Sequence, residues 1–476
     1  MLRNEKFESV DAINQKMTNY RWIICTLLFF ATTINYIDRQ VLSLLQPYLS
    51  EKFSWSYSDY ANITSVFQFC YAIALLFAGK FIDKFGTKRG YAWALIFWSI
   101  GAMIHAFANS IGIMLSPLFS IFGIMMPVSV IGFIFARLVL GIGEAGNFPS
   151  AIKTTAEWFP RKERSFSTGI FNSGANIGAV VAPLSVPLIS QYFGWEYAFI
   201  IVGATGFLWL IFWKYYYNSP KELLEKGKIN KAEYNYIHSD IEEQFVEDDA
   251  KDEGSENKIR WAHLLKYRQT WSFVTGKFLT DGVWWFFLFW LPSFLKSYYS
   301  MTGTQIMMPL AVLYTMTMIG SVCGGWLPAY FVNKGVKMYS ARMTSMIVIA
   351  LFPLVVLFAQ PLSGLNYWWP IFLIGIGTSA HQAWSANLFT TVSDMFPKKV
   401  VASVTGIGGM AGGISGVLVS KIGGWLLDYY SASGHIETGY TILFTFCATA
   451  YLLAWVIMKL LVPKFKPITL ASLKDS

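Results

Sequence analysis

The feature that most constrains this chain is a succession of apolar runs, each long enough to cross a bilayer. A transmembrane helix needs about 20 mostly apolar residues, and the 476-residue sequence contains twelve such runs. The runs are continuous, which favours helices over the alternating strands of an outer-membrane barrel. With 54% hydrophobic and 14% charged residues, the composition argues against a soluble enzyme, a fibrous protein or a disordered chain. We predict an all-α polytopic membrane protein with spans at 21–47, 57–82, 89–108, 130–152, 164–191, 195–217, 270–296, 304–332, 340–360, 367–393, 400–426 and 438–462.

A polar segment divides these runs into two groups of six. Residues 218–265 contain no run of spanning length and hold many of the acidic residues. Two six-helix halves joined by a polar linker are typical of transporters built from two parallel repeats. We predict a cytoplasmic N-terminus at 1–20, an N-terminal half at 21–217, a cytoplasmic linker with short helices at 218–265, a C-terminal half at 266–462 and a cytoplasmic C-terminus at 463–476.

Lys and Arg residues fall mainly in the loops on one side of the predicted membrane, including Lys84, Lys88 and Arg89 after the second span. Such loops face the cytoplasm, so we expect a multi-pass protein of the cell inner membrane with both termini cytoplasmic. The bias also favours twelve spans over thirteen, with the apolar stretch 109–130 as a re-entrant or interfacial insert on the periplasmic side. Basic residues spread over short loops do not indicate a nucleic-acid partner. The four cysteines lack CxxC spacing, so we expect neither disulfides nor a metal site. Glycine-rich stretches such as GIGEAG lie inside apolar runs and not after strands, so we expect no cofactor.

The loop after the second span carries a distinctive pattern, G-x-x-x-D-K-x-G-T-K-R, at residues 79–89. Gly79 permits close helix approach, and Asp83 is expected to cap a neighbouring helix and to pair with Lys88 and Arg89. Such contacts can latch the cytoplasmic side of a carrier, so these four residues are gating or structural candidates. The alternative is an ordinary positive-inside loop.

Four charged residues interrupt apolar runs in the first and fourth spans. Asp38 and Arg39 are adjacent, and each charge costs roughly 2.5–3.5 kcal/mol at a helix centre. Arg137 and Glu144 are two helical turns apart and share a face. Burial favours a protonated carboxylate, and arginine can grip a carboxylate through two parallel hydrogen bonds, so together they fit a site for an anion and a proton. The alternatives are a first-span pair at the outer interface and a structural ion-pair network.

The seventh and tenth spans supply further candidates. Lys277 and Asp281 are four residues apart, which fits either a structural pair within the helix or a gating role. Trp285 can stack on a sugar ring, although tryptophans in such chains commonly face lipid or the interface. The tenth span, HQAWSANLFTTVSDMFP, is rich in hydrogen-bonding groups that suit a hydroxylated substrate or, alternatively, bonds between helices. P-loop, HExxH and GxSxG motifs are missing from the sequence, so ATP-driven or protease chemistry has no support.

The strings NYIDRQ, GKFIDKFGTKRG, RLVLGIGEAGNFPS, FNSGANIGAVVAP, KFLTDGVWWFFLFWLP and HQAWSANLFTTVSDMFP resemble the major facilitator superfamily, its anion:cation symporter family and, more narrowly, bacterial hexuronate transporters. The resemblance covers nearly the whole chain. It implies that Arg39 binds the substrate carboxylate, that Asp38 and Glu144 handle the proton, and that Arg137 is a coupled cation. We assign the remaining substrate contacts to Tyr36, Tyr71, Asn172, Trp285, His381, Trp384, Ser385 and Asn387.

The leading hypothesis is therefore proton-coupled symport of a hexuronate such as glucuronate or galacturonate by a functional monomer. A second hypothesis keeps the transport and changes the cargo to another organic anion, such as galactonate or glucarate. A remote third hypothesis is a membrane sensor, which would require a folded extramembrane domain larger than the polar linker.

Overall fold

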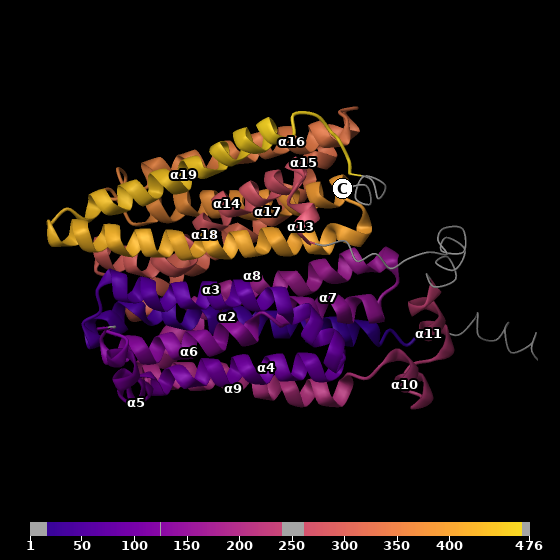
Figure 1. Cartoon of the computed structure of the whole chain (residues 1–476), viewed down its shortest axis with the longest axis horizontal. Coiled ribbons are helices and arrows are strands. Elements are labelled where there is room, and N and C mark those ends of the chain that lie inside the picture. The colour runs from indigo at the N-terminus through magenta and orange to yellow at the C-terminus, as the bar shows by residue number, and fades with distance from the viewer. Residues whose placement is uncertain (1–16, 124, 240–260, 469–476) are drawn as a thin grey trace, which may run out of the picture.

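The structure of the protein is a computed structural model that describes residues 17–123, 125–239 and 261–468. Residues 1–16 of the predicted N-terminus, 469–476 of the predicted C-terminus and 240–260 of the predicted linker lie outside the described residues. The described chain forms a bundle of long helices (Figure 1). They are α2 (Arg21–Phe53), α3 (Tyr57–Phe85), α4 (Thr87–Ile104), η1 (His105–Phe107), α5 (Ala108–Ile121), α6 (Val128–Glu144), α7 (Asn147–Trp158), α8 (Arg161–Phe193), α9 (Trp195–Tyr216), α10 (Pro220–Glu225), α11 (Lys231–Ile237), α13 (Trp261–Leu264), α14 (Arg268–Tyr299), η2 (Gly303–Ile306), α15 (Met307–Asn333), α16 (Met338–Leu351), η3 (Phe352–Phe358), α17 (Trp368–Met395), α18 (Lys398–Ala432) and α19 (Ile436–Leu461).

The long helices coincide with the predicted apolar runs. Within the described ranges, ten helical stretches are long and apolar enough to cross a membrane. Helices α2 and α17 are also long, at 33 and 28 residues. They are less apolar because they carry polar strings that include Asp38 and Arg39 in α2 and His381 and Asn387 in α17. These two helices hold more than half of the predicted substrate-binding and proton-handling residues.

The apolar stretch 109–130 differs from the insert that we predicted. Helix α5 continues α4 through the short 3₁₀ turn η1, and α6 begins at Val128, so this stretch forms a helical hairpin. Two glycines allow the hairpin to close. A Cβ atom at Gly112 would lie 1.9 Å from the carbonyl oxygen of Val128, and one at Gly132 would lie 1.6 Å from that of Ala108. Such close backbone approach is what small residues provide between membrane helices. Residues Thr87–Ile121 thereby form one continuous helical stretch that packs back against α6.

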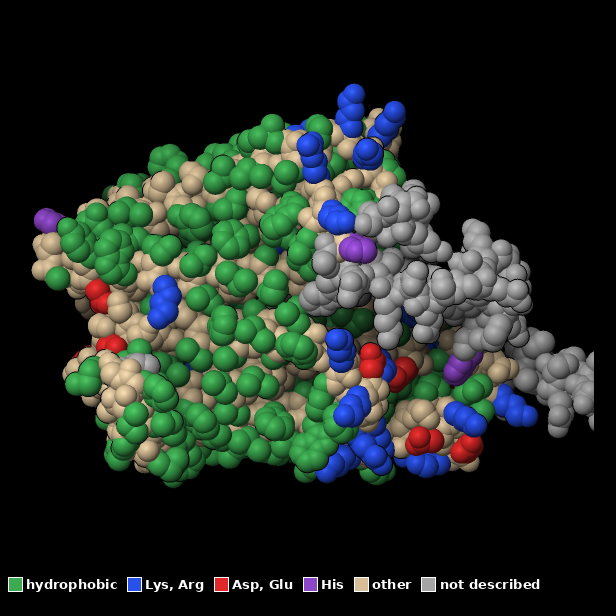
Figure 2. All heavy atoms as spheres, in the orientation of Figure 1, with side chains coloured by type: hydrophobic (Ala, Val, Ile, Leu, Met, Phe, Trp, Pro, Cys, Tyr) green, Lys and Arg blue, Asp and Glu red, His purple; other side chains and the backbone are tan. Residues whose placement is uncertain are grey.

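The helices are arranged in two groups, with α2 to α9 below α14 to α19 in the view of Figure 1. We call the end of the bundle that carries α10 and α11 the linker end, and the opposite end the far end. Figure 2 shows that Lys and Arg side chains gather at the linker end on the visible face, while hydrophobic side chains cover the middle of the bundle. A wide apolar belt with charge at one end is the surface expected of a protein that spans a bilayer.

Among the described residues, the hydrogen bonds that join the two groups lie toward the far end. Both carboxylate oxygens of Asp428 accept bonds from the start of α3, from the backbone N–H of Tyr57 at 2.7 Å and of Ser58 at 2.8 Å. Lys296 donates to the carbonyl oxygen of Pro47 at 2.6 Å. Nearer the middle, Ser420 donates to the side-chain oxygen of Gln68 at 3.2 Å. The two groups are therefore fastened to each other at the far end.

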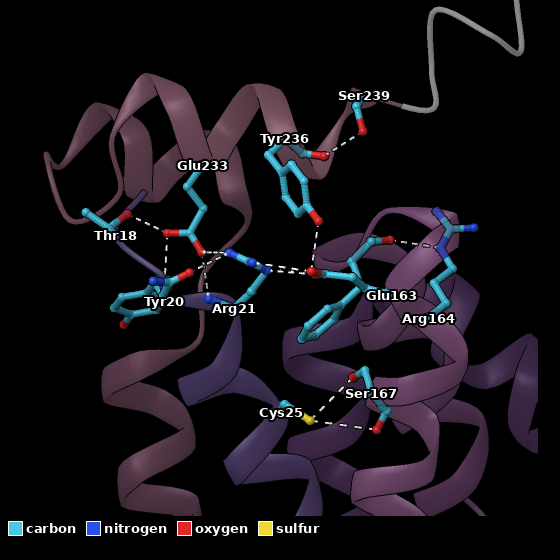
Figure 3. A network of polar contacts seen from close by, with 12 residues as sticks. Thr18, Tyr20, Arg21, Cys25, Glu163, Arg164, Ser167, Glu233, Tyr236 and Ser239 are labelled. Carbon is cyan, nitrogen blue, oxygen red and sulfur yellow. Dashed lines mark hydrogen bonds and ion pairs between the residues drawn. The ribbon is translucent and has the colours of Figure 1, made fainter. Parts of the chain in front are cut away.

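Helix α11 is docked onto the first group through one buried acid, Glu233, whose side chain is fully buried (Figure 3). Its carboxylate accepts hydrogen bonds from the Thr18 hydroxyl, from the backbone N–H of Tyr20 at 2.9 Å and of Arg21 at 3.0 Å, and from the Arg21 guanidinium at 3.2 Å. Arg21 also pairs with Glu163 of α8 at 2.9 Å. The acid thus satisfies the free N–H groups at the start of α2 and ties that helix to α8.

We expect Glu233→Ala to destabilise the protein, because removing one partner of a buried ionic network costs roughly 3–5 kcal/mol. The measurement is the apparent melting temperature of the purified protein in detergent, which should fall by several degrees. Glu225→Ala is the matched control, since Glu225 is an exposed acid at the end of neighbouring α10. Equal melting temperatures for the two variants would contradict this role for Glu233.

Candidate functional site

The centre of the candidate site is Arg39, which lies in the middle of α2 and is 3% exposed. Its guanidinium donates to one oxygen of Glu144, with Nε at 2.9 Å and Nη2 at 2.7 Å. The other Glu144 oxygen, Oε1, has no hydrogen-bond partner. A carboxylate that uses only one oxygen to bind a buried guanidinium leaves donor capacity on the arginine that a second carboxylate could take.

Four aromatic rings enclose the Arg39 guanidinium. Its central carbon lies 4.8 Å from the ring centroid of Tyr36, 4.9 Å from Tyr71, and 5.4 Å from both Phe67 and Trp285. Cation–π contacts of this kind hold a cation within about 6 Å of each ring. The enclosure combines residues from α2, α3 and α14, so both groups of helices contribute to it.

Asp38 is the neighbouring buried acid, and it makes no hydrogen bond. It is 2% exposed, and neither carboxylate oxygen has a hydrogen bond. Adjacent residues on a helix point about 100° apart, so Asp38 does not reach the bond that Arg39 makes. An ionised carboxylate in such surroundings is expensive, which makes Asp38 a natural site for a proton.

Arg137 completes this cluster from α6. Both terminal nitrogens of its guanidinium donate to the backbone carbonyl oxygen of Arg39 at 3.3 Å. Arg137 and Glu144 are seven residues apart, about two helical turns, so both side chains reach α2 from one face of α6. The predicted grouping of Asp38, Arg39, Arg137 and Glu144 is thus present in the structure.

Sequence reasoning missed two members of this region. Phe67 packs against both arginines, with the Arg137 guanidinium 5.2 Å from its ring. Gln40 is fully buried, and neither of its side-chain polar atoms has a partner. Gln40 belongs to the quoted string NYIDRQ, so its place beside two charged residues in an apolar run was the available signal. Phe67 had no comparable signal among the 39 phenylalanines.

The predicted tenth-span residues His381, Trp384 and Asn387 all contact other helices of the second group. The ring of His381 stacks on Trp284 with centroids 5.1 Å apart, and its Nδ1 is 2.9 Å from the Tyr451 hydroxyl. Trp384 is fully buried against Tyr451. The Asn387 amide donates to the carbonyl oxygens of Gly324 at 2.8 Å and Ala383 at 2.9 Å, so it fastens α17 to α15. Trp384 and Asn387 therefore serve packing between helices in this conformation.

Two predicted contacts are not drawn into the cluster. Asn172 is exposed on α8, and Ser385 is half-buried on α17 without a described hydrogen bond.

Lys277 and Asp281 do form the predicted ion pair on α14, with the ammonium nitrogen 2.6 Å from a carboxylate oxygen.

The loop at residues 79–89 also differs in detail from the prediction. Asp83 pairs with Lys153 of α7 at 2.7 Å instead of with the basic residues of its own loop. Lys88 donates to the side-chain oxygen of Asn218 at 2.7 Å, and Arg89 is exposed. A Cβ atom at Gly79 would have no atom within 4 Å, so close helix approach at this glycine is not used here. The partners differ because residues distant in sequence set them, and the loop pattern does not encode those residues.

The comparisons with known proteins agree with this architecture. Residues 28–420 match the model of the Major Facilitator Superfamily. The chain is 30% identical over 417 residues to the hexuronate transporter of Escherichia coli (strain K12), covering 87% of this chain and 89% of that protein. It is 31% identical over 316 residues to the galacturonate transporter of Dickeya chrysanthemi, covering 66% of this chain and 84% of that protein.

Among solved structures, the chain resembles the crystal structure of a D-xylose-proton symporter with a TM-score of 0.69 and 15% identity. The match covers 94% of this chain and 100% of that one, and at this identity it supports the fold. A family model that spans most of the chain, together with two groups of membrane-spanning helices around a buried charged cluster, identifies the protein as a multi-pass membrane transporter of the Major Facilitator Superfamily.

Proposed function

We propose that this protein is a proton-coupled symporter for a hexuronate anion such as glucuronate or galacturonate, working by alternating access as a monomer in the cell inner membrane. The observation that carries the proposal is the buried Arg39, which is enclosed by aromatic rings and donates hydrogen bonds to a single oxygen of Glu144. The names of the relatives in Escherichia coli and Dickeya chrysanthemi support the substrate class.

The proposed coupling follows from competition for one guanidinium. A substrate carboxylate that binds Arg39 displaces Glu144, and a displaced, buried carboxylate without its partner costs several kcal/mol. Protonation of Glu144 removes that cost, so anion and proton enter the site together. Asp38, whose carboxyl group has no hydrogen-bond partner, is the second proton-carrying group.

The charge balance of the site favours a monoanion with one proton. The charged groups at the site are three acids (Asp38, Glu144 and Asp281) and three bases (Arg39, Arg137 and Lys277). When all six groups are ionised in the empty site, a bound monoanion adds one negative charge, and one proton taken up by Asp38 or Glu144 restores neutrality. Neutral contents lower the free energy needed to move the loaded site through a low-dielectric membrane.

We place the linker end in the cytoplasm, with both chain termini on that side. The Lys and Arg side chains that gather at this end in Figure 2 support that orientation, because cytoplasmic loops are enriched in them. Substrate would then enter from the far end and leave toward the linker end.

The test is uptake of labelled glucuronate into proteoliposomes that hold a pH gradient, alkaline inside. We expect accumulation against the glucuronate gradient, and we expect it to collapse when a protonophore is added. Uptake that ignores the pH gradient would overturn the coupling. The alternative cargoes, galactonate and glucarate, are separated by a thermal-shift panel, since a true ligand stabilises the folded protein by mass action.

A further inference from the structure

The ion pair of Lys277 and Asp281 on α14 is not explained by stability. Their side chains are 9% and 15% exposed, and the two charged atoms lie 2.6 Å apart. Taking two charges out of water costs about as much as their attraction returns, and apolar replacements of buried pairs are often neutral or stabilising. A pair kept in the middle of a membrane helix therefore requires a different reason.

The position of the pair connects it to the candidate site. Lys277, Asp281 and Trp285 occupy successive turns on one face of α14, and Trp285 contacts the Arg39 guanidinium. The Trp285 ring also packs edge-on against Tyr71, with ring centroids 6.5 Å apart. The face of α14 that carries the pair is therefore turned toward the residues that enclose Arg39.

The packing around Asp281 leaves space for its carboxylate beside Gly412 of α18 and leaves the side chain partly exposed. A Cβ atom on Gly412 of α18 would lie 2.2 Å from an Asp281 carboxylate oxygen, so only a glycine fits beside it. Every other residue from 280 to 295 is buried, whereas Asp281 keeps partial exposure. Lys277 lies 4.7 Å from the ring centroid of Phe389 of α17. The pair is thus held in place by α17 and α18 but stays reachable.

Two of the expected hydroxyl-binding groups of the tenth span, His381 and Asn387, are already engaged, whereas Ser385 is not. Asn387 bonds to two backbone carbonyl oxygens, and His381 bonds to Tyr451. The pair on α14 has the chemistry that these residues no longer offer. An ammonium group donates up to three hydrogen bonds, a carboxylate accepts several, and bonds to charged groups are the stronger kind.

We propose that Lys277 and Asp281 bind the hydroxyl-bearing end of the sugar acid whose carboxylate is held by Arg39, and so determine which sugar acid is accepted. This inference rests on the proposed function and adds the specificity-determining residues to it. One helical turn, about 5.4 Å, separates Asp281 from the residue on α14 that touches Arg39. That spacing is comparable to the width of a sugar ring.

The test is a charge exchange, Lys277→Asp combined with Asp281→Lys. The exchange keeps an ion pair on α14 but reverses donor and acceptor, so a purely structural pair would be restored by it. Binding is measured in detergent, without any gradient, to glucuronate, galacturonate and their deoxy analogues. We expect affinity for the fully hydroxylated acids to fall about ten- to a hundredfold in Asp281→Asn and in the exchanged protein. Affinity for the deoxy analogues should change little.

A second variant and a matched control complete the experiment. Lys277→Arg keeps the charge and is the decisive variant if Asp281→Asn or the exchanged protein aggregates, and it too should alter the preference for hydroxylated acids. The same exchange at Arg342 and Asp394, an ion pair 2.5 Å long between α16 and α17, should leave that preference intact. Recovery of both melting temperature and preference in the Lys277/Asp281 exchange would overturn the inference, as would an unchanged preference in Lys277→Arg. Absence of sugar-acid binding in the unaltered protein would instead contradict the proposed function.

Discussion

Arg39→Gln is expected to abolish sugar-acid binding, with at least a hundredfold loss of affinity. Truncating one member of a buried, hydrogen-bonded charge pair costs about 2–5 kcal/mol or more, and this residue is also the proposed partner of the substrate carboxylate. Arg39→Lys should recover part of the binding, since lysine keeps the charge but lacks the planar fork that holds a carboxylate through two bonds. The measurement is the ligand-induced rise in melting temperature across a concentration series.

The control for this variant is Arg342→Gln, which removes a cation that pairs with Asp394 at 2.5 Å elsewhere in the second group of helices. It should bind glucuronate with the affinity of the unaltered protein. A folded Arg39→Gln protein that is still stabilised by glucuronate would show that the carboxylate binds elsewhere.

Asp38→Asn is expected to separate transport from its driving force. Asparagine has the size of a protonated aspartate and cannot take up or release a proton. The variant should therefore lose pH-driven accumulation, and its ratio of internal to external glucuronate should settle at about one, the value for an uncoupled carrier. Exchange of internal for external glucuronate should persist, because exchange needs no net proton movement.

Both readouts come from the same proteoliposomes, so protein orientation and amount are matched. Asp59→Asn serves as the control, because that aspartate caps the start of α3 through Ser56 and lies outside the candidate site. It should leave accumulation intact. An Asp38→Asn protein that still concentrates glucuronate when the inside is alkaline would remove Asp38 from the coupling.

Much of the fold was predictable because membrane spans are encoded locally. A run of about 20 apolar residues has few alternatives to a spanning helix, and each predicted span coincides with a long helix or, for 130–152, with the consecutive helices α6 and α7. The charged cluster was predictable for a related reason. Charges such as Arg39 and Glu144 are so unfavourable in apolar runs that each requires a partner, and helical spacing put Arg137 and Glu144 on one face.

The parts that sequence reasoning missed depend on partners distant in the chain. No local pattern indicates that Glu233 caps α2, that Asp83 pairs with Lys153, or that the Asn387 amide donates to the carbonyl oxygen of Gly324. The hairpin at 109–130 depends on contact between Gly112 and the start of α6, which only the packed helices reveal. Apolar pattern and helical spacing therefore predict elements and faces, and tertiary packing decides which polar groups remain free for a ligand.

The fastening of the two groups at the far end has a kinetic consequence. In the orientation that we propose, the bonds of Asp428, Lys296 and Ser420 must break before the site can open to the outside. Each such bond contributes roughly 0.5–1.5 kcal/mol net, so their loss adds to the barrier for that opening whether the site is loaded or empty.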